Sequence, residues 1–374
     1  MKVVSTLLVF CAAGLLAFGM VALYSASMAQ VGAHWLMQQL VWSALGLVAA
    51  VAAASIDYRH WQKFAWVILV VAVLLLGLVL ACGIVVKGAR RWLDLGGFRL
   101  QPSEFAKLAL ILFLAHYGDR YQRKMPTLTG GVLLPSLAIG VVLGLVFVEP
   151  DRGTTVFLAA VSATLLLLAG VRWLHVLPPL ATAAAALAFS LAHDPMRWTR
   201  IMSYLDVEAT KEGVGMQAWH AQLAFGAGGW TGLGLGNGLQ KLGFIPEQHT
   251  DFILPVIGEE LGLVASLLVV LAYVVIVFSG FYIAWRAREA FGFLLAAGIT
   301  LMIGLQAIVN ISVVTSVLPN KGLPLPFISY GGSNLLVMLT GIGLLLSVAR
   351  HANARAGSLP TAAGTTDAES HEFV

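Results

Sequence analysis

The residues with the clearest chemical potential are polar groups that stand at the edges of apolar segments. Residues 244–253 contain Glu247, His249 and Asp251 directly before a long apolar stretch. Asp251 stands where a helix is expected to begin, so its carboxylate could cap that helix. A carboxylate at the mouth of a cavity can also act as a general base or bind a cation. From the residues alone Asp251 therefore stays open between a capping role and a role as general base or cation ligand, and Glu247 and His249 join it as candidate site residues for substrate.

A second polar segment, residues 87–107, contains Arg91, Trp92, Glu104 and Lys107. The run Gln-Pro-Ser-Glu that ends at Glu104 is typical of a helix start. Glu104 and Lys107 are three residues apart, so they share one helix face and could form a simple local ion pair. Charge close to an apolar segment is costly, which favours a functional role over a purely local one. We expect these four side chains to contact an anionic substrate.

Two further segments are unusual for connecting loops. Residues 318–333 are apolar yet rich in Pro and Gly, and irregular backbone of this kind is tolerated near a membrane where it lines a cavity. Lys321 and Ser329 of this segment are candidate substrate contacts. The Glu-Pro-Asp-Arg-Gly turn at 149–153 interrupts an apolar stretch and adds Asp151 to the candidates.

The composition shows what kind of molecule must position these residues. Hydrophobic residues make up 59% of the 374 positions and charged residues only 11%, whereas soluble domains carry about 25% charged residues. The chain is too poor in charge to cover a soluble surface. Its formal net charge of +4 is too small to indicate nucleic acid binding. Cys11 and Cys82 lie in apolar runs, which argues against a disulfide framework or a cysteine metal site.

The apolar runs predict an all-α polytopic membrane protein with about ten transmembrane helices, since a spanning helix needs about 20 mostly apolar residues. A large extracytoplasmic loop, residues 194–251, is expected between helices 7 and 8. Residues 1–350 form the transmembrane domain, and residues 351–374 are predicted to be a disordered cytoplasmic tail. The predicted spans are 3–27, 35–56, 64–86, 104–117, 131–148, 154–170, 174–193, 252–285, 291–317 and 333–349.

Basic residues in short loops indicate the orientation, with both termini cytoplasmic. The loop with Arg286 and Arg288 is an example of a short basic inner loop. About half of the 22 Lys and Arg residues fall on the outer side, against this rule. Some of them could reach lipid phosphates. The clusters described above favour a cationic outer surface for an anionic substrate.

Several long motifs in this order resemble the SEDS family (shape, elongation, division and sporulation). The resemblance extends along nearly the whole chain and is closer to the FtsW branch than to the RodA branch. It is carried by Tyr24-Ser25-Ala26-Ser27-Met28, Lys87-Gly88-Ala89-Arg90-Arg91-Trp92, Gln101-Pro102-Ser103-Glu104 with Lys107, Glu149-Pro150-Asp151, Pro246-Glu247-Gln248-His249-Thr250-Asp251-Phe252, Gly258-Glu259-Glu260-Leu261-Gly262 and Ile328-Ser329-Tyr330-Gly331-Gly332-Ser333.

This resemblance implies a multi-pass protein of the bacterial inner membrane that polymerises lipid II into glycan strands at the outer face. It implies release of undecaprenyl diphosphate, a class B penicillin-binding protein as partner, and other division or elongation proteins. The family's catalytic aspartate lies in a His-Thr-Asp-Phe segment, which here assigns the role to Asp251. Glu104 and Lys107 match the family's pair in the fourth helix. Arg152 departs from the family pattern, which affects the role of the neighbouring Asp151.

Three questions stay open at the level of the sequence. A lipid II flippase would use the same cationic cavity, although no internal repeat is visible. A division scaffold without catalysis is a further alternative, but it leaves the outer charged clusters unexplained. No cofactor is required by the sequence, and a divalent cation (Mg or Mn) at Asp251 is left open. Glu259 and Glu260, inside an apolar span, could hold helices together or bind substrate.

Overall fold

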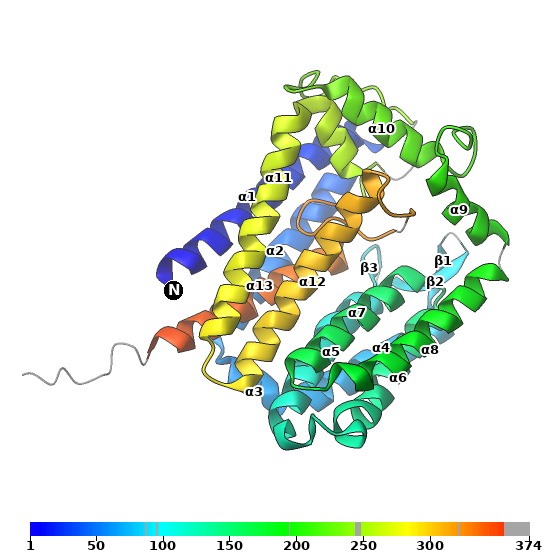
Figure 1. Cartoon of the computed structure of the whole chain (residues 1–374). Helices are drawn as coiled ribbons and strands as arrows, with labels where there is room; N and C mark the ends of the chain where they lie inside the picture. Colours follow the sequence, from blue (N-terminus) through cyan, green and yellow to red (C-terminus); the bar gives the residue numbers. More distant parts are fainter. Residues whose placement is uncertain (87, 95, 194, 244–247, 321, 355–374) are drawn as a thin grey trace, which may run out of the picture.

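The computed structural model describes residues 1–86, 88–94, 96–193, 195–243, 248–320 and 322–354, and within them the chain is almost entirely helical. The long helices run side by side as one bundle (Figure 1). The main helices are α1 (Lys2–Val31), α2 (His34–Ser55), α4 (Ala65–Cys82), α5 (Pro102–Arg120), α6 (Leu134–Val148), α7 (Arg152–Leu168), α8 (Trp173–Ala192), α11 (Ile253–Arg286), α12 (Ala290–Val314) and α13 (Gly332–Ala354), with the short α3 (Tyr58–Lys63) between α2 and α4.

The helix lengths fit the predicted polytopic membrane protein. Among the described residues, eight helices are long and apolar enough to cross a membrane, and α7 is a shorter apolar helix. The remaining long helix, α5, carries Glu104, Lys107, Asp119 and Arg120 within its 19 residues, so it exceeds the charge expected of an ordinary span. With α5 and α7, the described residues contain ten long helices at the positions of the ten predicted spans, and the predicted fold class, an all-α polytopic membrane protein, is confirmed.

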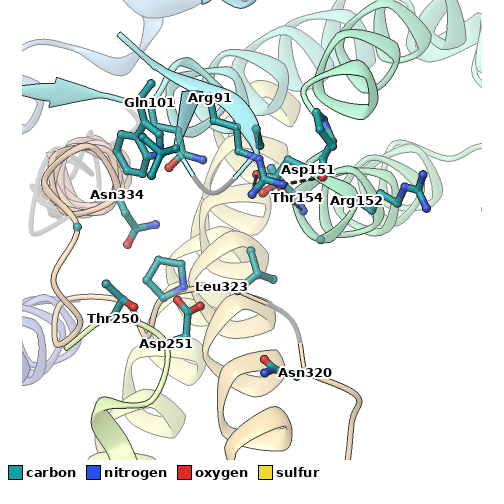
Figure 2. A pocket seen from close by; sticks show the side chains of 18 of the residues that line it. Arg91, Gln101, Asp151, Arg152, Thr154, Thr250, Asp251, Asn320, Leu323 and Asn334 are labelled. Atoms are coloured by element: carbon teal, nitrogen blue, oxygen red, sulfur yellow. Dashed lines mark hydrogen bonds and ion pairs between the residues drawn. The ribbon is translucent and has the colours of Figure 1, made fainter. Parts of the chain in front are cut away.

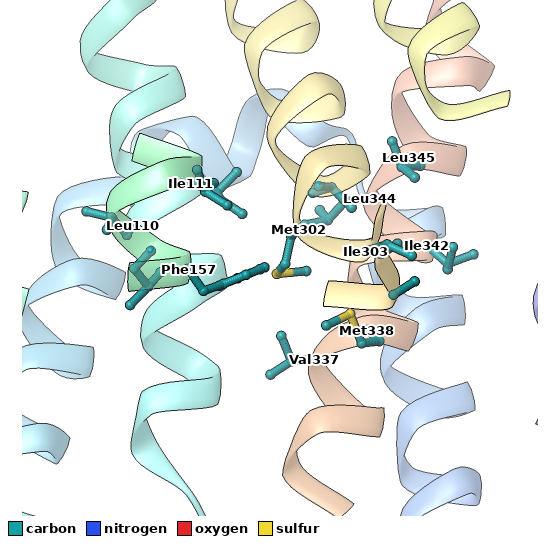
Figure 3. Close-up of a cluster of buried hydrophobic side chains, with 14 of the residues drawn as sticks. Leu110, Ile111, Phe157, Met302, Ile303, Val337, Met338, Ile342, Leu344 and Leu345 are labelled. Carbon is teal, nitrogen blue, oxygen red and sulfur yellow. The ribbon is translucent and has the colours of Figure 1, made fainter. Parts of the chain in front are cut away.

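Burial separates central helices from peripheral ones. In their most apolar windows, 83% of α13 and 72% of α12 are buried, whereas α8 is only 6% buried. Figure 3 shows the centre of the core, where Leu110 of α5, Phe157 of α7, Met302 of α12 and Met338 of α13 meet. Polar groups on α5, α12 and α13 are therefore held by the most rigidly packed part of the bundle.

A small sheet follows α4 where a longer helix was predicted. The predicted span 64–86 is wrong at its end, because α4 ends at Cys82 and β1 (Ile84–Val86) begins two residues later. Strand β1 pairs with β2 (Ala89–Asp94), which pairs with β3 (Arg99–Leu100), all antiparallel. Val, Ile, Arg and Trp suit a half-exposed strand. The sheet lies at one end of the bundle, which we call the sheet end.

The predicted outer loop also lies at the sheet end and contains two short helices, α9 (Pro195–Leu205) and α10 (Met216–Gly228). The glycine-rich run 226–238, which begins at the end of α10, packs against the backbone of α11. A β-carbon at Gly228 would lie 1.9 Å from the carbonyl oxygen of Gly258. Gly262 has a φ of +77° and breaks the regular geometry of α11 beside Trp230. Glycine is needed at these two positions because no side chain fits the approach of the two backbones.

Candidate active site

A cavity of about 740 Å³ opens at the sheet end of the bundle. Segments far apart in sequence form its wall: β2, the first turn of α5, the turn before α7, the start of α10, and the loops that precede α11 and α13. The polar side chains that line it are Arg91, Trp92, Gln101, Glu104, Asp151, Arg152, Thr154, Gln217, Thr250, Asp251, Asn320, Tyr330, Ser333 and Asn334.

Asp251 lies in the loop immediately before α11, and its side chain is directed into the cavity. Figure 2 shows its carboxylate beside Leu323, across the opening from Arg91 and Asp151. The backbone carbonyl of Asp251 accepts a hydrogen bond from Asn310 Nδ2 at 2.8 Å. Its carboxylate packs against Gly322, where a β-carbon would lie 2.9 Å from Oδ2. The backbone of Asp251 is thus held by α12, and its carboxylate lies against Gly322 on the wall of the cavity.

The opposite wall is organised by Arg91 of β2. Its Nε donates to the carbonyl of Glu149 at 3.0 Å, and its Nη2 donates to the carbonyl of Pro150 at 2.6 Å. Its Nη1 lies 3.9 Å from Oδ2 of Asp151. Asp151 in turn caps α7 by accepting from the backbone N–H of Thr154 at 3.1 Å. The guanidinium therefore fixes the turn before α7 while part of it stays exposed to the cavity.

Glu149, immediately after the end of α6, is a buried carboxyl beside this wall. It is fully buried, and neither of its carboxylate oxygens has a hydrogen-bond partner among the described residues. Burial and, to a lesser extent, the charge of Asp151 raise the pKa of Glu149 to about 8, against a smaller opposing effect of Arg91. Because the shifted pKa exceeds neutral pH, this carboxyl holds its proton at pH 7.

Glu104 and Lys107 form a buried ion pair in the first turns of α5, with 2.8 Å between Glu104 Oε1 and Lys107 Nζ. Glu104 Oε2 accepts from Asn334 Nδ2 at 2.7 Å, and Lys107 Nζ donates to Gln306 Oε1 at 2.9 Å. Lys107 also lies over the ring of Phe157, at 5.3 Å. Glu104 lines the cavity, whereas Lys107 is fully buried and does not.

Lys107 was expected to contact a substrate anion directly, but its side chain does not reach the cavity. The reason is geometric. Lys107 lies one turn deeper along α5 than Glu104, and its ammonium group is directed to partners inside the bundle. Its positive charge still lies directly behind Glu104, and Glu104 forms part of the cavity wall.

Two further predicted substrate contacts, His249 and Ser329, lie behind the cavity wall. The His249 ring stacks on Trp35, with 3.7 Å between the ring centroids. The Ser329 hydroxyl donates to the carbonyl of Thr250 at 2.6 Å and accepts from the backbone N–H of Leu325 at 2.8 Å. Neither side chain lines the cavity, so both hold the loops that do. The predicted contacts Glu247 and Lys321 lie outside the described residues.

The structure adds amide side chains that sequence reasoning missed. Asn320 Nδ2 donates to Gln217 Oε1 at 2.5 Å and joins the Pro-rich segment to α10. Asn334 binds Glu104 from the start of α13. Gln306 and Asn310 stand inside the apolar run of α12, and an uncharged polar pair inside a spanning segment is a signal that could have found them.

Glu259 and Glu260 serve a different region. Glu260 Oε1 lies 2.5 Å from Lys241 Nζ, and Glu260 Oε2 accepts from Ser25 Oγ at 2.6 Å. Glu259 accepts from the backbone N–H of Leu239 at 2.9 Å. Both carboxylates are buried outside the cavity. They hold the glycine-rich loop against α1 and α11, as expected for the first of the two roles that the sequence left open.

Comparison with known proteins places this architecture in a family. The sequence model of the FtsW, RodA and SpoVE proteins, described as "cell cycle protein", matches residues 5–354. The chain belongs to this family. It is 42% identical over 342 residues to a probable peptidoglycan glycosyltransferase FtsW of Trichlorobacter lovleyi, covering 89% of this chain and 90% of that protein. A protein of the same name from Coxiella burnetii is 40% identical and covers 91% of this chain and 95% of its own.

Solved structures share the fold at lower sequence identity. A chain of a peptidoglycan synthase complex, studied for the structural coordination of polymerization and crosslinking, superposes with a TM-score of 0.78. It is 30% identical and covers 93% of this chain and 98% of its own. The rod shape determining protein RodA of Thermus thermophilus superposes with a TM-score of 0.68 at 29% identity, covering 92% of this chain and 96% of its own.

Proposed function

We propose that this protein is a peptidoglycan glycosyltransferase of the FtsW type that polymerises lipid II. The observation that carries the proposal is the Asp251 carboxylate, which is directed into a cavity of about 740 Å³ in a chain 42% identical to a probable enzyme of that activity. A carboxylate at the mouth of such a cavity is placed to accept the proton of an acceptor hydroxyl.

The proposed reaction joins two lipid-linked sugars. The acceptor hydroxyl oxygen forms a bond to the anomeric carbon of the donor chain, while the bond between that carbon and the diphosphate oxygen breaks. The hydroxyl proton passes to the Asp251 carboxylate, and undecaprenyl diphosphate leaves with the bonding electrons. The carboxylate later loses the proton to solvent, so the enzyme is regenerated.

Stabilisation of the departing diphosphate is assigned to the basic residues of the opposite wall. Arg91 lines the cavity there, and Lys107 adds a buried positive charge behind Glu104. Fixed charges aimed at a developing anion usually provide a large part of catalysis because they need no rearrangement during the step. Lys321 remains part of the proposal on the basis of the sequence alone.

A divalent cation at Asp251 is part of the proposal, bound together with substrate. Among the described residues, no group of three or more His, Cys, Asp or Glu side chains could hold a metal ion alone. Mg²⁺ commonly binds through one or two carboxylates together with substrate phosphates. Asp251 would be the protein ligand, and the ion would neutralise charge on the diphosphate. To test this, lipid II polymerisation is measured with EDTA and again after Mg²⁺ or Mn²⁺ is added. Loss of polymerisation with EDTA and its recovery with the metal ion would support the cation.

The partner and the cellular setting follow from the same proposal. A class B penicillin-binding protein is the proposed partner, in line with the similarity to a peptidoglycan synthase complex. The sheet end would face the outside of the bacterial inner membrane, with both termini in the cytoplasm. The FtsW names of the relatives favour a role in cell division over elongation.

The experiment is polymerisation of purified lipid II by the protein with its class B partner. We expect Asp251→Ala to abolish polymerisation in a folded complex, and Asp94→Asn, outside the cavity, to retain it. Normal polymerisation by Asp251→Ala would remove Asp251 from the mechanism. Translocation of labelled lipid II in liposomes, with no polymerisation by the wild-type complex, would instead support a flippase.

A further inference from the structure

Two amide side chains of α12, Gln306 and Asn310, are buried in the centre of the bundle. They are 0% and 1% exposed, and their spacing of four residues puts them on one face of the helix. A buried amide is costly unless it is hydrogen-bonded, so its partners indicate what it is for. Each amide NH₂ group donates to backbone carbonyls in the loops around Asp251.

Asn310 joins the two loops that form the lower wall of the cavity. Its Nδ2 donates to the carbonyl of Asp251 at 2.8 Å and to the carbonyl of Leu323 at 2.8 Å. Asp251 and Leu323 are 72 positions apart in the sequence. One NH₂ group thus links the candidate catalytic residue to the Pro-rich segment that packs against its carboxylate.

Gln306 binds the same Pro-rich segment at Pro324, the residue after Leu323. Its Nε2 donates to the carbonyl of Pro324 at 2.8 Å, and its Oε1 accepts from Lys107 Nζ at 2.9 Å. A lysine ammonium is only a donor and a carbonyl is only an acceptor, so these two partners fix the orientation of the Gln306 amide. Glu104 holds Lys107 in turn. The buried ion pair therefore orients Gln306.

The Asp251 carboxylate is sensitive to the position of this segment because it packs against Gly322. A shift of residues 322–324 would either open a gap behind the carboxylate or push it toward the substrate. Displacement of a reacting group by about 1 Å can lower a rate about a hundredfold.

From these contacts we infer that Gln306 and Asn310 are positioning residues, which hold Asp251 and residues 322–324 at the distance that keeps the carboxylate aimed at the acceptor hydroxyl. The inference rests on the proposed function, because it takes Asp251 as the proton acceptor. It gives the Glu104–Lys107 pair an indirect role through Gln306, in addition to its charge.

The first test measures kcat and KM for lipid II polymerisation by the complex with the class B partner. Asn310→Leu and Gln306→Met keep similar volume and remove the amides. We expect each to lower kcat by about ten- to a hundredfold while KM changes by less than about threefold, because the loss falls on the transition state. Thr300→Val is the matched control, since Thr300 is equally buried in α12 but bonds only to Ala296 of its own helix.

The second test follows amide hydrogen exchange in the same variants. We expect faster exchange in peptides that cover 248–252 and 322–328 in Asn310→Leu, and unchanged exchange there in Thr300→Val. A purely structural role for Asn310 would spread the change over the neighbouring helices as well.

Three outcomes would overturn the inference: wild-type kcat in folded Asn310→Leu, an equal loss in Thr300→Val, or a loss of kcat with unfolding of the variant. Failure of the inference is distinguishable from failure of the proposed function. If Asp251→Ala is inactive and Asn310→Leu is fully active, only the positioning role is wrong. If Asp251→Ala is active, the proposed mechanism is wrong.

Discussion

A β-carbon at position 322 would lie 2.9 Å from the Oδ2 atom of Asp251, so Gly322 leaves the space that this carboxylate occupies. Real β-carbons essentially never approach a heavy atom so closely. Gly322 does not have a positive φ, so a side chain there would add a steric contact without backbone strain. A methyl group at position 322 would push the Asp251 carboxylate, which is the movable end of its side chain, out of its present position. A reaction rate falls steeply when a reacting group is displaced.

Gly322→Ala is therefore expected to reduce kcat for lipid II polymerisation by about tenfold or more, with little change in thermal stability. Gly226→Ala is the control, because a β-carbon at Gly226 in α10 meets nothing within 4 Å. Polymerisation rates and melting temperatures of both variants check the prediction. Equal activity of the two variants would show that the carboxylate position is not critical.

The buried Glu104–Lys107 pair predicts an unequal response to single and double substitution. Lys107→Met leaves the Glu104 carboxylate buried without its cation, which is expected to lower the free energy of unfolding by about 3–5 kcal/mol. The double variant Glu104→Gln with Lys107→Met buries no charge and should be more stable than Lys107→Met alone. Thermal unfolding in detergent measures both. A double variant less stable than Lys107→Met would contradict this account.

An exposed pair at the opposite end of the bundle provides a contrast. Arg59 Nη2 lies 2.5 Å from Glu289 Oε1, but the two side chains are 49% and 40% exposed. The hydrogen bond from Arg59 holds the pKa of Glu289 below its usual value. The pair therefore stabilises the folded protein fully at pH values above the pKa that Glu289 has in the unfolded chain. This stabilisation is lost as the pH falls through the lower pKa of Glu289 in the folded protein.

For Glu289→Gln we accordingly expect a loss of less than about 1 kcal/mol at pH 7, because solvent screens exposed pairs. The loss should shrink at high salt. Melting temperatures of wild type and variant at pH 7, with low and high salt, give the measurement. A loss as large as that of Lys107→Met would mean that this pair is not screened by solvent.

The spans were predictable because apolar length decides them. The predicted 35–56, for example, is observed as His34–Ser55, and 252–285 as Ile253–Arg286. The sheet of β1–β3 was not predictable in the same way. Its strands are short, and their pairing depends on neighbours that a local pattern does not contain.

The sequence was sufficient to predict which segments form the candidate site. It was less informative about which side chains of those segments point into the cavity. The motifs around Asp251, Glu104 and Asp151 do converge on one cavity. Spacing could not show that Lys107 turns inward to Gln306, or that His249 stacks on Trp35, since both contacts join residues far apart in sequence. Whether such a side chain faces the cavity or the interior of the bundle depends on the packing of the whole bundle.

The last prediction concerns Glu149, whose pKa is raised to about 8 from an ordinary value of 4.5. A raised carboxyl pKa means that the folded state keeps a proton that the unfolded state releases between these two values. The stabilisation is complete below about pH 4.5, declines as the pH rises, and levels off above about pH 8. Over that range the decline should be on the order of a few kcal/mol.

Glu149→Gln keeps the shape and cannot ionise, so it should lack this decline. The melting temperature of the variant minus that of the wild type should therefore increase between pH 5 and pH 8, and other titrating groups cancel in the difference. A constant difference would show that Glu149 is ionised in the folded protein at neutral pH. In that case Arg91, which already binds the carbonyl of Glu149, would have to balance a carboxylate charge as well as fix the turn.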